Sequence, residues 1–206
     1  MARERATALL VDLDGVLRQW DPAVGEAVER EFGLPSGALL ETATRWSLLQ
    51  PAVTGRVSHL DWMAGVAEAL AEPAGGRERA IAAVDQWQAY RGAVDPDVLA
   101  FVREVRGNGH PVALATNATD RLDADLTALG LTEEVDLVLN SSVLGVHKPA
   151  KEFFQRACQE LATPPGRVLF VDDDDRSVRG ARAAGLSAYR WSGPADLTYL
   201  RAALAD

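Results

Sequence analysis

The sequence predicts an α/β fold: a doubly wound, Rossmann-like parallel sheet with an inserted block of α-helices. Short apolar runs alternate with helical stretches, and most of the runs end at a polar or acidic cluster. Continuous apolar runs of this length suit strands that are buried on both faces, as in parallel sheets. Strand and helix in alternation imply right-handed βαβ units.

Five strands and five helices of the sheet layer are assigned in order. The strands are predicted at Ala6–Val11, Val112–Ala115, Val135–Leu139, Val168–Val171 and Leu186–Tyr189. The helices are predicted at Pro96–Arg106, Thr119–Leu129, Glu152–Leu161, Arg176–Ala184 and Ala195–Leu204. Prolines precede or open the first and last of these helices, and glycines follow the second and fourth, which are typical helix boundaries.

A different pattern fills residues 18 to 91, where no strand-like run occurs. Helical stretches are expected near Ala23–Phe32, Ala38–Leu49, Ser58–Leu70 and Arg77–Tyr90, with breaks at Gly33–Pro35, Pro51 and Pro73–Gly76. Trp46, Trp62 and Trp87 lie here and predict a small bundle with a tryptophan-rich core. We therefore expect a core, 1–17 and 92–206, and a helical cap, 18–91, above the carboxyl ends of the strands, where open α/β sheets bind ligands.

Composition and charge exclude several classes of function. The 206 residues are 48% hydrophobic and carry a formal net charge of −9, which disfavours broad binding to nucleic acid or to anionic membranes. The single cysteine, Cys158, excludes an internal disulfide and a cysteine-based zinc cluster. The apolar runs are too short for a membrane span or a secretory signal, so we expect a cytoplasmic protein.

Two aspartates follow the first predicted strand. Asp12 and Asp14, two residues apart, can project toward the same pocket while the chain stays extended. Gly15 then allows the backbone to turn away. Taken alone, the pattern fits a capping aspartate and a turn equally well.

Four consecutive aspartates, Asp172–Asp175, follow the fourth predicted strand. Asp174 or Asp175 suits the N-terminal cap of the next helix, but this role leaves Asp172 and Asp173 unexplained. Crowded carboxylates raise one another's pKa and cost stability, and a divalent cation removes that cost. Oxygen ligands of this kind suit Mg²⁺.

Two weaker signals follow other strands. Thr116 and Asn117 offer a hydroxyl and a backbone N–H where a phosphate would bind, although taken alone an ordinary helix cap is the better interpretation. The sequence has only two lysines, against nineteen arginines, and Lys148 is one of them. The following Pro149 restricts the backbone of Lys148. A lysine held in this way is a point charge with a defined direction.

Together and in this order, these segments resemble the motifs of the haloacid dehalogenase-like (HAD) hydrolase superfamily. The four motifs correspond to Asp12-Leu13-Asp14-Gly15-Val16, Thr116-Asn117, Lys148-Pro149 and Asp172-Asp173. The last has the form of subfamily IA, and the resemblance covers the whole chain, with the helical insert as a C1 cap. Ser177 departs from the pattern, because some relatives carry Asp or Asn four residues beyond the metal aspartate.

The resemblance implies a Mg²⁺-dependent phosphomonoesterase that acts on a small phosphorylated metabolite. Asp12 would attack the substrate to give an aspartyl-phosphate, and Asp14 would act as general acid and then general base. The metal ligands it implies are Asp12, the backbone carbonyl of Asp14, Asp173 and, directly or from behind, Asp172. The substrate-binding residues it implies are Thr116, Asn117 and Lys148, and Lys148 would also neutralise the nucleophile.

Asp14 favours a phosphatase, because dehalogenases of this fold generally lack an acid two residues after the nucleophile and release halide without a proton. A phosphomutase, a metal-independent 2-haloacid dehalogenase and a non-catalytic binding or regulatory module stay open as alternatives. In the cap, Arg56 of the Thr54-Gly55-Arg56 loop is a candidate contact for the non-phosphoryl half of the substrate, and Arg18 and Gln19 are similar candidates.

Overall fold

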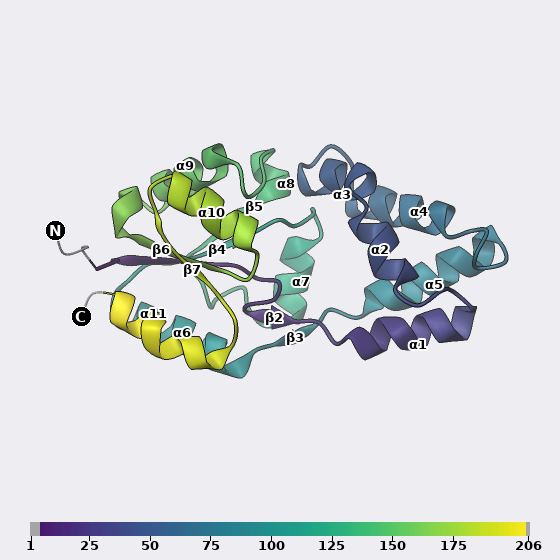
Figure 1. Ribbon diagram of the computed structural model, residues 1–206, viewed down its shortest axis with the longest axis horizontal. Coiled ribbons are helices and arrows are strands. Elements are labelled where there is room, and N and C mark those ends of the chain that lie inside the picture. Colours follow the sequence, from purple (N-terminus) through teal and green to yellow (C-terminus); the bar gives the residue numbers. More distant parts are fainter. Residues whose placement is uncertain (1–4, 205–206) are drawn as a thin grey trace.

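The computed structural model describes residues 5–204, and a parallel sheet lies in the left half of Figure 1 with helices around it. Among the described residues, five strands pair in the order β5-β4-β1-β6-β7, all parallel. Their bounds are β1 Ala8–Val11, β4 Val112–Thr116, β5 Leu137–Asn140, β6 Val168–Asp172 and β7 Ser187–Arg190. The predicted α/β class with a helical insert is confirmed.

Helices cover both faces of the sheet because successive side chains of each strand point to opposite sides. In β1, Leu9 and Val11 pack with one set of helices, and Ala8 and Leu10 pack with the other. The first set is α6 Pro96–Gly107, α7 Leu122–Ala128 and α11 Leu197–Ala203, and the second is α9 Lys151–Glu160 and α10 Asp175–Ala183. Short segments complete this layer: α8 Ser141–Leu144 and the 3₁₀ turns Pro165–Arg167 and Pro194–Asp196.

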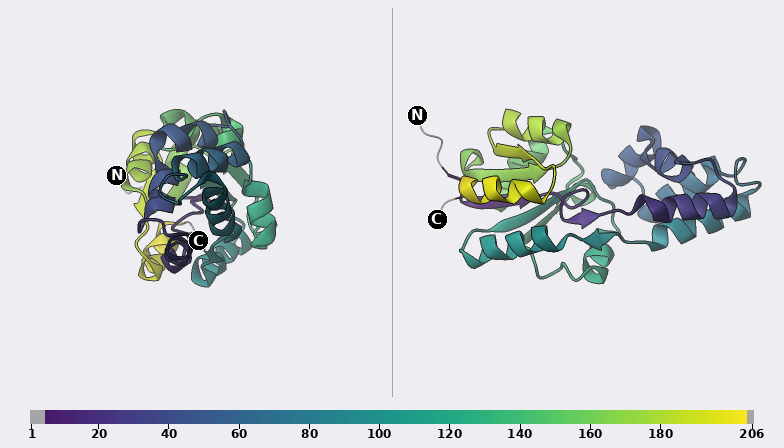
Figure 2. Two further views of the ribbon diagram at one scale, coloured as in Figure 1. Left: turned by 90° about the vertical axis from the view of Figure 1, so that its right-hand side faces the viewer. Right: turned by 60° about the horizontal axis from the view of Figure 1, so that its bottom comes forward.

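The helical insert lies beyond the carboxyl ends of the strands and packs around its own apolar cluster (Figure 2). Its helices are α1 Pro22–Phe32, α2 Ala38–Thr44, α3 Trp46–Val53, α4 His59–Ala69 and α5 Arg77–Ala89. Two short antiparallel strands, β2 Arg18–Gln19 and β3 Ala93–Val94, carry the chain out of the sheet layer and back. Within residues 5–204, the search for a helix of membrane-spanning length and hydropathy finds none.

Three local expectations for the insert are wrong. The stretch Ala38–Leu49 is two helices, because Arg45 has extended backbone angles (φ −56°, ψ 120°) that interrupt it while the apolar period continues. Pro51 lies inside α3 instead of ending it, and that helix stops soon afterwards at Val53. Residues Arg18–Gln19 form β2, which is too short to leave a strand pattern in the sequence.

The expected tryptophan-rich core is also wrong. The buried cluster of the insert consists of smaller side chains, such as Val28, Leu39 and Met63. Trp46 is 55% exposed, and Trp62 and Trp87 are half-buried at the edge of the cluster, where they line a cavity. An indole has a polar N–H and a broad apolar face, so it suits such an edge better than a fully buried site.

Candidate active site

The carboxyl ends of β4, β1 and β6 meet at one edge of the sheet. Val11 is in register with Leu114 of β4 and with Val171 of β6, so the next residues of β1 and β6, Asp12 and Asp172, are neighbours. The Asp12 amide extends the ladder by donating to the carbonyl oxygen of Val171 at 2.9 Å. Two acidic side chains that are far apart in the chain are thereby fixed side by side.

Lys148 joins these two carboxylates. Its Nζ lies 2.8 Å from Oδ1 of Asp12 and 2.6 Å from Oδ2 of Asp172, and the residue is only 3% exposed. Burial lowers the pKa of Lys148, but the two carboxylates outweigh burial and hold that pKa above its ordinary value. Burial raises the pKa of Asp12 well above its usual range; Lys148 opposes this and Asp172 adds to it. One ammonium therefore serves two carboxylates, and the site is short of positive charge.

Asn117 holds the Lys148 backbone from the neighbouring strand end. Its amide nitrogen donates to the Lys148 carbonyl oxygen at 3.0 Å, and its amide oxygen accepts from the Lys148 N–H at 2.8 Å. Nδ1 of His147 also lies 2.6 Å from the same carbonyl oxygen. The Asn117 side chain is therefore engaged in positioning Lys148.

Asp173 completes an acidic group at the sheet edge. One carboxylate oxygen from each of Asp12, Asp172 and Asp173 lies within 4.8 Å of the others, a spacing at which one cation can contact all three. Partial burial and the neighbouring Asp172 raise the pKa of the Asp173 carboxyl. Three hard oxygen donors that repel one another fit a magnesium site by the chemistry of their atoms.

The remaining aspartates of the run shape the loop. Asp174 is the N-cap of α10, as predicted, and its carboxylate accepts from the N–H and the hydroxyl of Ser177 at 3.0 and 2.9 Å. The Asp174 N–H in turn donates to Oδ1 of Asp172 at 2.7 Å. Ser177 thus supports the acidic group through Asp174, to which its hydroxyl donates.

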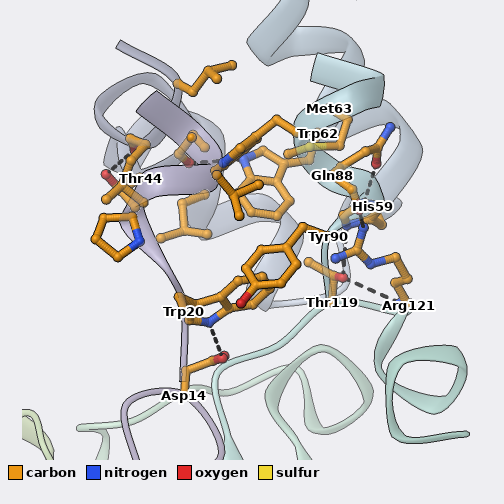
Figure 3. A pocket seen from close by; sticks show the side chains of 18 of the residues that line it. Asp14, Trp20, Thr44, His59, Trp62, Met63, Gln88, Tyr90, Thr119 and Arg121 are labelled. Carbon is orange, nitrogen blue, oxygen red and sulfur yellow. Dashed lines mark hydrogen bonds between the residues drawn. The ribbon is translucent and has the colours of Figure 1, made fainter. Parts of the chain in front are cut away.

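Asp14 points away from this group, toward the insert. Its carboxylate accepts from Nε and Nη2 of Arg18 at 2.7 and 3.0 Å and from the indole N–H of Trp20 at 2.7 Å. Arg18 is itself buried and also donates to Asp125 at 3.1 Å. In Figure 3, Asp14 stands at the core side of a large cavity between the insert and the sheet layer.

Comparisons with known proteins agree with this geometry. The family model of the haloacid dehalogenase-like hydrolases matches residues 6–185. The chain belongs to the haloacid dehalogenase-like hydrolase family. The hydrolase is 30% identical to a phosphoserine phosphatase of Thermus thermophilus, over 91% of this chain and 73% of that protein. It is 29% identical to a phosphatase of Mycobacterium tuberculosis, over 89% of this chain and 86% of the relative.

Solved structures share the fold of the hydrolase. A HAD family enzyme from Bacteroides thetaiotaomicron, in complex with magnesium and inorganic phosphate, aligns with a TM-score of 0.71 at 18% identity, over 91% of this chain and 94% of that one. A dehalogenase with an intermediate complex aligns with a TM-score of 0.72 at 24% identity, over 98% and 99%. The chain is thus an enzyme of a hydrolase family whose close relatives include phosphatases.

The two other predicted substrate residues have different surroundings. Thr116 ends β4 beside the acidic group and is 1% exposed. Arg56 is exposed in the turn between α3 and α4 and is not among the residues that line the large cavity. Their contacts with substrate stay predictions.

Sequence reasoning missed two supports of the site. Trp20 binds Asp14, and nothing in the local pattern marks it. Gly180 lies inside α10, where a Cβ atom would be 2.4 Å from the carbonyl oxygen of Pro149, directly after Lys148. A glycine in a helix interior costs about 1 kcal/mol relative to alanine. A glycine inside a predicted helix, such as Gly180, could therefore have indicated a position where another segment packs too closely for a side chain.

Proposed function

We propose that this hydrolase removes the phosphoryl group from a small phosphorylated metabolite, with Asp12 as nucleophile and Mg²⁺ as cofactor. The deficit of positive charge is the observation that carries the proposal: Asp12, Asp172 and Asp173 gather around the single ammonium of Lys148. A phosphate dianion entering this group requires further positive charge, which is the main requirement of phosphoryl transfer.

The donor atoms present fit Mg²⁺. Asp12, Asp173 and the backbone carbonyl of Asp14 would hold it, as the resemblance implies. Both oxygens of Asp172 are already engaged, one by Lys148 and one by the Asp174 N–H, so Asp172 orients the group and adds negative charge. When bound, Mg²⁺ offsets the negative charge of the phosphoryl oxygens and of the carboxylates.

In the proposed reaction, Asp12 attacks phosphorus through one carboxylate oxygen. The Leu13 N–H and Lys148 Nζ both bind its Oδ1, which leaves Oδ2 for the new bond. As the bond from Asp12 to phosphorus forms, the ester bond breaks and the leaving oxygen takes a proton from Asp14. Water then attacks the phosphorus of the aspartyl-phosphate and gives a proton back to Asp14, while the bond between phosphorus and the Asp12 oxygen breaks, so that the Asp12 carboxylate is regenerated and inorganic phosphate is released.

Asp14 separates the alternatives chemically. A halide leaves without a proton, whereas an alkoxide needs one, and Asp14 lies where the leaving group would extend into the cavity. We therefore favour hydrolysis of a phosphate ester over dehalogenation. Release of inorganic phosphate distinguishes hydrolysis from intramolecular transfer by a phosphomutase.

The wider assignments belong to the same proposal. We infer that residues 18–91 act as the cap over a core of 1–17 and 92–206, and that the substrate is a small molecule. A cytoplasmic location and the lack of a nucleic-acid or membrane partner stay predictions from charge and composition.

The test is phosphate release from 4-nitrophenyl phosphate with Mg²⁺ and with EDTA. We expect turnover with Mg²⁺, background rates with EDTA, and background rates for Asp12→Asn at an unchanged melting temperature. Chloride release from 2-chloropropionate in EDTA would instead support the dehalogenase. Turnover by Asp12→Asn would remove Asp12 as the nucleophile.

Metal binding is tested separately by melting temperature. Saturation at about 100 times Kd adds about 2.7 kcal/mol, which raises the melting temperature by about 5–10 °C for a chain of this size. Asp173→Asn should lose most of this shift. Asp175→Asn removes an exposed carboxylate of the same run, paired only with Arg179 among the described residues, and should keep the shift.

A further inference from the structure

A cavity of about 650 Å³ lies between the insert and the sheet layer, and Asp14 and Asn117, neighbours of the acidic group and of Lys148, are part of its lining. Its core side is lined by Asp14, Asn117 and residues at the start of α7, and its other side by residues of all five helices of the insert, α1 to α5. This volume is in the usual range for small-molecule sites. Because Asp14 is the proposed acid for the leaving oxygen, the leaving group of a bound ester extends into this space.

Aromatic rings form much of the cavity wall (Figure 3). Trp20 and Tyr90 stand next to Asp14 with ring centroids 5.7 Å apart in an edge-to-face contact, and Trp62 and Met63 lie on the side away from Asp14. Two indole N–H groups are already used: that of Trp20 donates to Asp14, and that of Trp62 donates to the carbonyl oxygen of Ala43. The Arg18 guanidinium covers one face of Trp20, 4.6 Å from the ring centroid, and Trp62 is in edge-to-face contact with His59. The remaining ring surfaces that line the cavity are apolar.

The charged side chains around the cavity are unfavourable to an anion. The carboxylates of its lining are Asp14, Asp21, Glu26, Glu29 and Asp125, against the guanidinium groups of Arg18 and Arg121. Arg18 is engaged with Asp14 and Asp125. Nη1 of Arg121 donates to the carbonyl oxygen of Gln88, and its Nε lies 3.2 Å from Oδ1 of Asp125 but has no hydrogen-bond partner among the described residues, so the charge of Arg121 is offset mainly by Asp125. A carboxylate or second phosphate on the leaving group would meet net negative charge in a partly desolvated space.

The other polar groups of the wall are neutral or satisfied. Glu29 accepts from the N–H groups of Gly37 and Leu39, which holds the start of α2. His59 contacts Gln88 and Thr119 through its two ring nitrogens. These groups can bind a hydroxyl or an ether oxygen, but they supply no positive charge.

We propose that the leaving group of the substrate is an uncharged aromatic or bulky aliphatic alcohol, which stacks on Trp20, Tyr90 and Trp62. The inference rests on the proposed phosphatase function. It excludes phosphate esters whose alcohol carries a carboxylate or a second phosphate, such as phosphoserine, from the good substrates. The cavity thus selects for the alcohol, while the acidic group and Lys148 bind the phosphoryl end common to all esters.

The test compares 4-methylphenyl phosphate with 4-carboxyphenyl phosphate, which have similar size and differ in charge. The full chain with Mg²⁺ should show a kcat/KM about 10–100-fold higher for the methyl compound, although the carboxylated phenol is chemically the better leaving group. The methyl compound should exceed glycerol 2-phosphate by a similar factor. Acetyl phosphate, which is too small to reach the far wall, reports phosphoryl transfer to Asp12 independently of the cavity.

Two variants locate the selectivity. Trp62→Ala should lower kcat/KM for 4-methylphenyl phosphate about 10-fold, and by a larger factor than it lowers kcat/KM for acetyl phosphate. Glu26→Lys adds positive charge to the cavity lining and should lower the ratio of kcat/KM for 4-methylphenyl phosphate to kcat/KM for 4-carboxyphenyl phosphate. Tyr199→Ala is the control: it removes an aromatic side chain that is 66% exposed on α11, and it should leave kcat/KM for both aryl esters unchanged.

The outcomes separate this inference from the proposed function. Equal or better turnover of 4-carboxyphenyl phosphate or phosphoserine, together with Mg²⁺-dependent turnover that Asp12→Asn abolishes, overturns the inference and keeps the phosphatase. Absence of phosphate release from every ester and from acetyl phosphate overturns both.

Discussion

A Cβ atom on Gly15 would lie 2.2 Å from Oδ2 of Asp173, so the turn after β1 and the loop after β6 touch without space for a side chain. Gly15 also has a φ of +80°, which L-residues rarely adopt. The close approach brings Asp173 against the loop that carries Asp12 and Asp14. The glycine of the first motif is therefore required by the acidic group as well as by the turn.

Gly15→Ala should displace Asp173 and reduce activity about 10–100-fold, with a smaller rise in melting temperature on adding Mg²⁺. The left-handed backbone alone costs about 1–2 kcal/mol. Gly130→Ala is the matched control, because Gly130 has a φ of +68° and no atom within 4 Å of an added Cβ. Equal losses of activity in the two variants would show that backbone strain, and not the contact with Asp173, is responsible.

Asn117→Ala should lower kcat about 10–100-fold with a small change in KM, because Lys148 loses the two hydrogen bonds that Asn117 makes with its backbone. Stability should fall by only about 1–3 kcal/mol, which denaturant unfolding measures. Asn108→Ala, an exposed asparagine after α6, serves as control and should behave as wild type. An effect confined to KM would instead assign Asn117 to direct substrate contact.

Gly55→Ala should separate the insert from the sheet layer. A Cβ atom on Gly55 would lie 2.2 Å from the carbonyl oxygen of Ser142 at the start of α8, so the turn between α3 and α4 must move. We expect a raised KM and a larger radius of gyration in small-angle X-ray scattering. Gly33→Ala is the control, because Gly33 also has a positive φ, +71°, but open space around an added Cβ. It should lower stability and leave KM and the radius of gyration unchanged.

His59 should make stability depend on pH. Burial lowers the pKa of His59, with a further contribution from Arg121, while Gln88, Asp125 and Asp120 act in the opposite direction. The unfolded state binds the His59 proton more readily than the folded state. The contribution of His59 to the free energy of unfolding is therefore fully present above its unfolded pKa of about 6.5, and it is lost as the pH falls through the lower pKa of the folded state.

Melting temperatures measured between pH 7.5 and 5 check this expectation. The His59→Gln variant should lose this part of the decline with acid, whatever its stability at neutral pH. A pH profile parallel to that of wild type would contradict the assignment. Carboxylates titrate mainly at lower pH and affect both proteins alike.

Much of the fold follows from local patterns. The strands are found close to their predicted positions because each is a short apolar run with inward side chains on both faces, as in β1 and β6. Asp12 and Asp172 are found at strand ends for the same reason. The break at Arg45 and the strand Arg18–Gln19 escape prediction, because neither changes the hydrophobic period.

Local patterns in the sequence were enough to predict the α/β class and the acidic residues at the strand ends, because parallel strands bring their carboxyl ends to one edge. The order of the strands in the sheet and the contacts of these residues came from the folded structure. Arg18 reaches Asp125 across 107 positions of the chain, and Asn117 reaches Lys148 across 31. The aromatic wall of the cavity likewise draws on separate helices of the insert. Such contacts depend on how elements pack, and local pattern carries no record of distant partners.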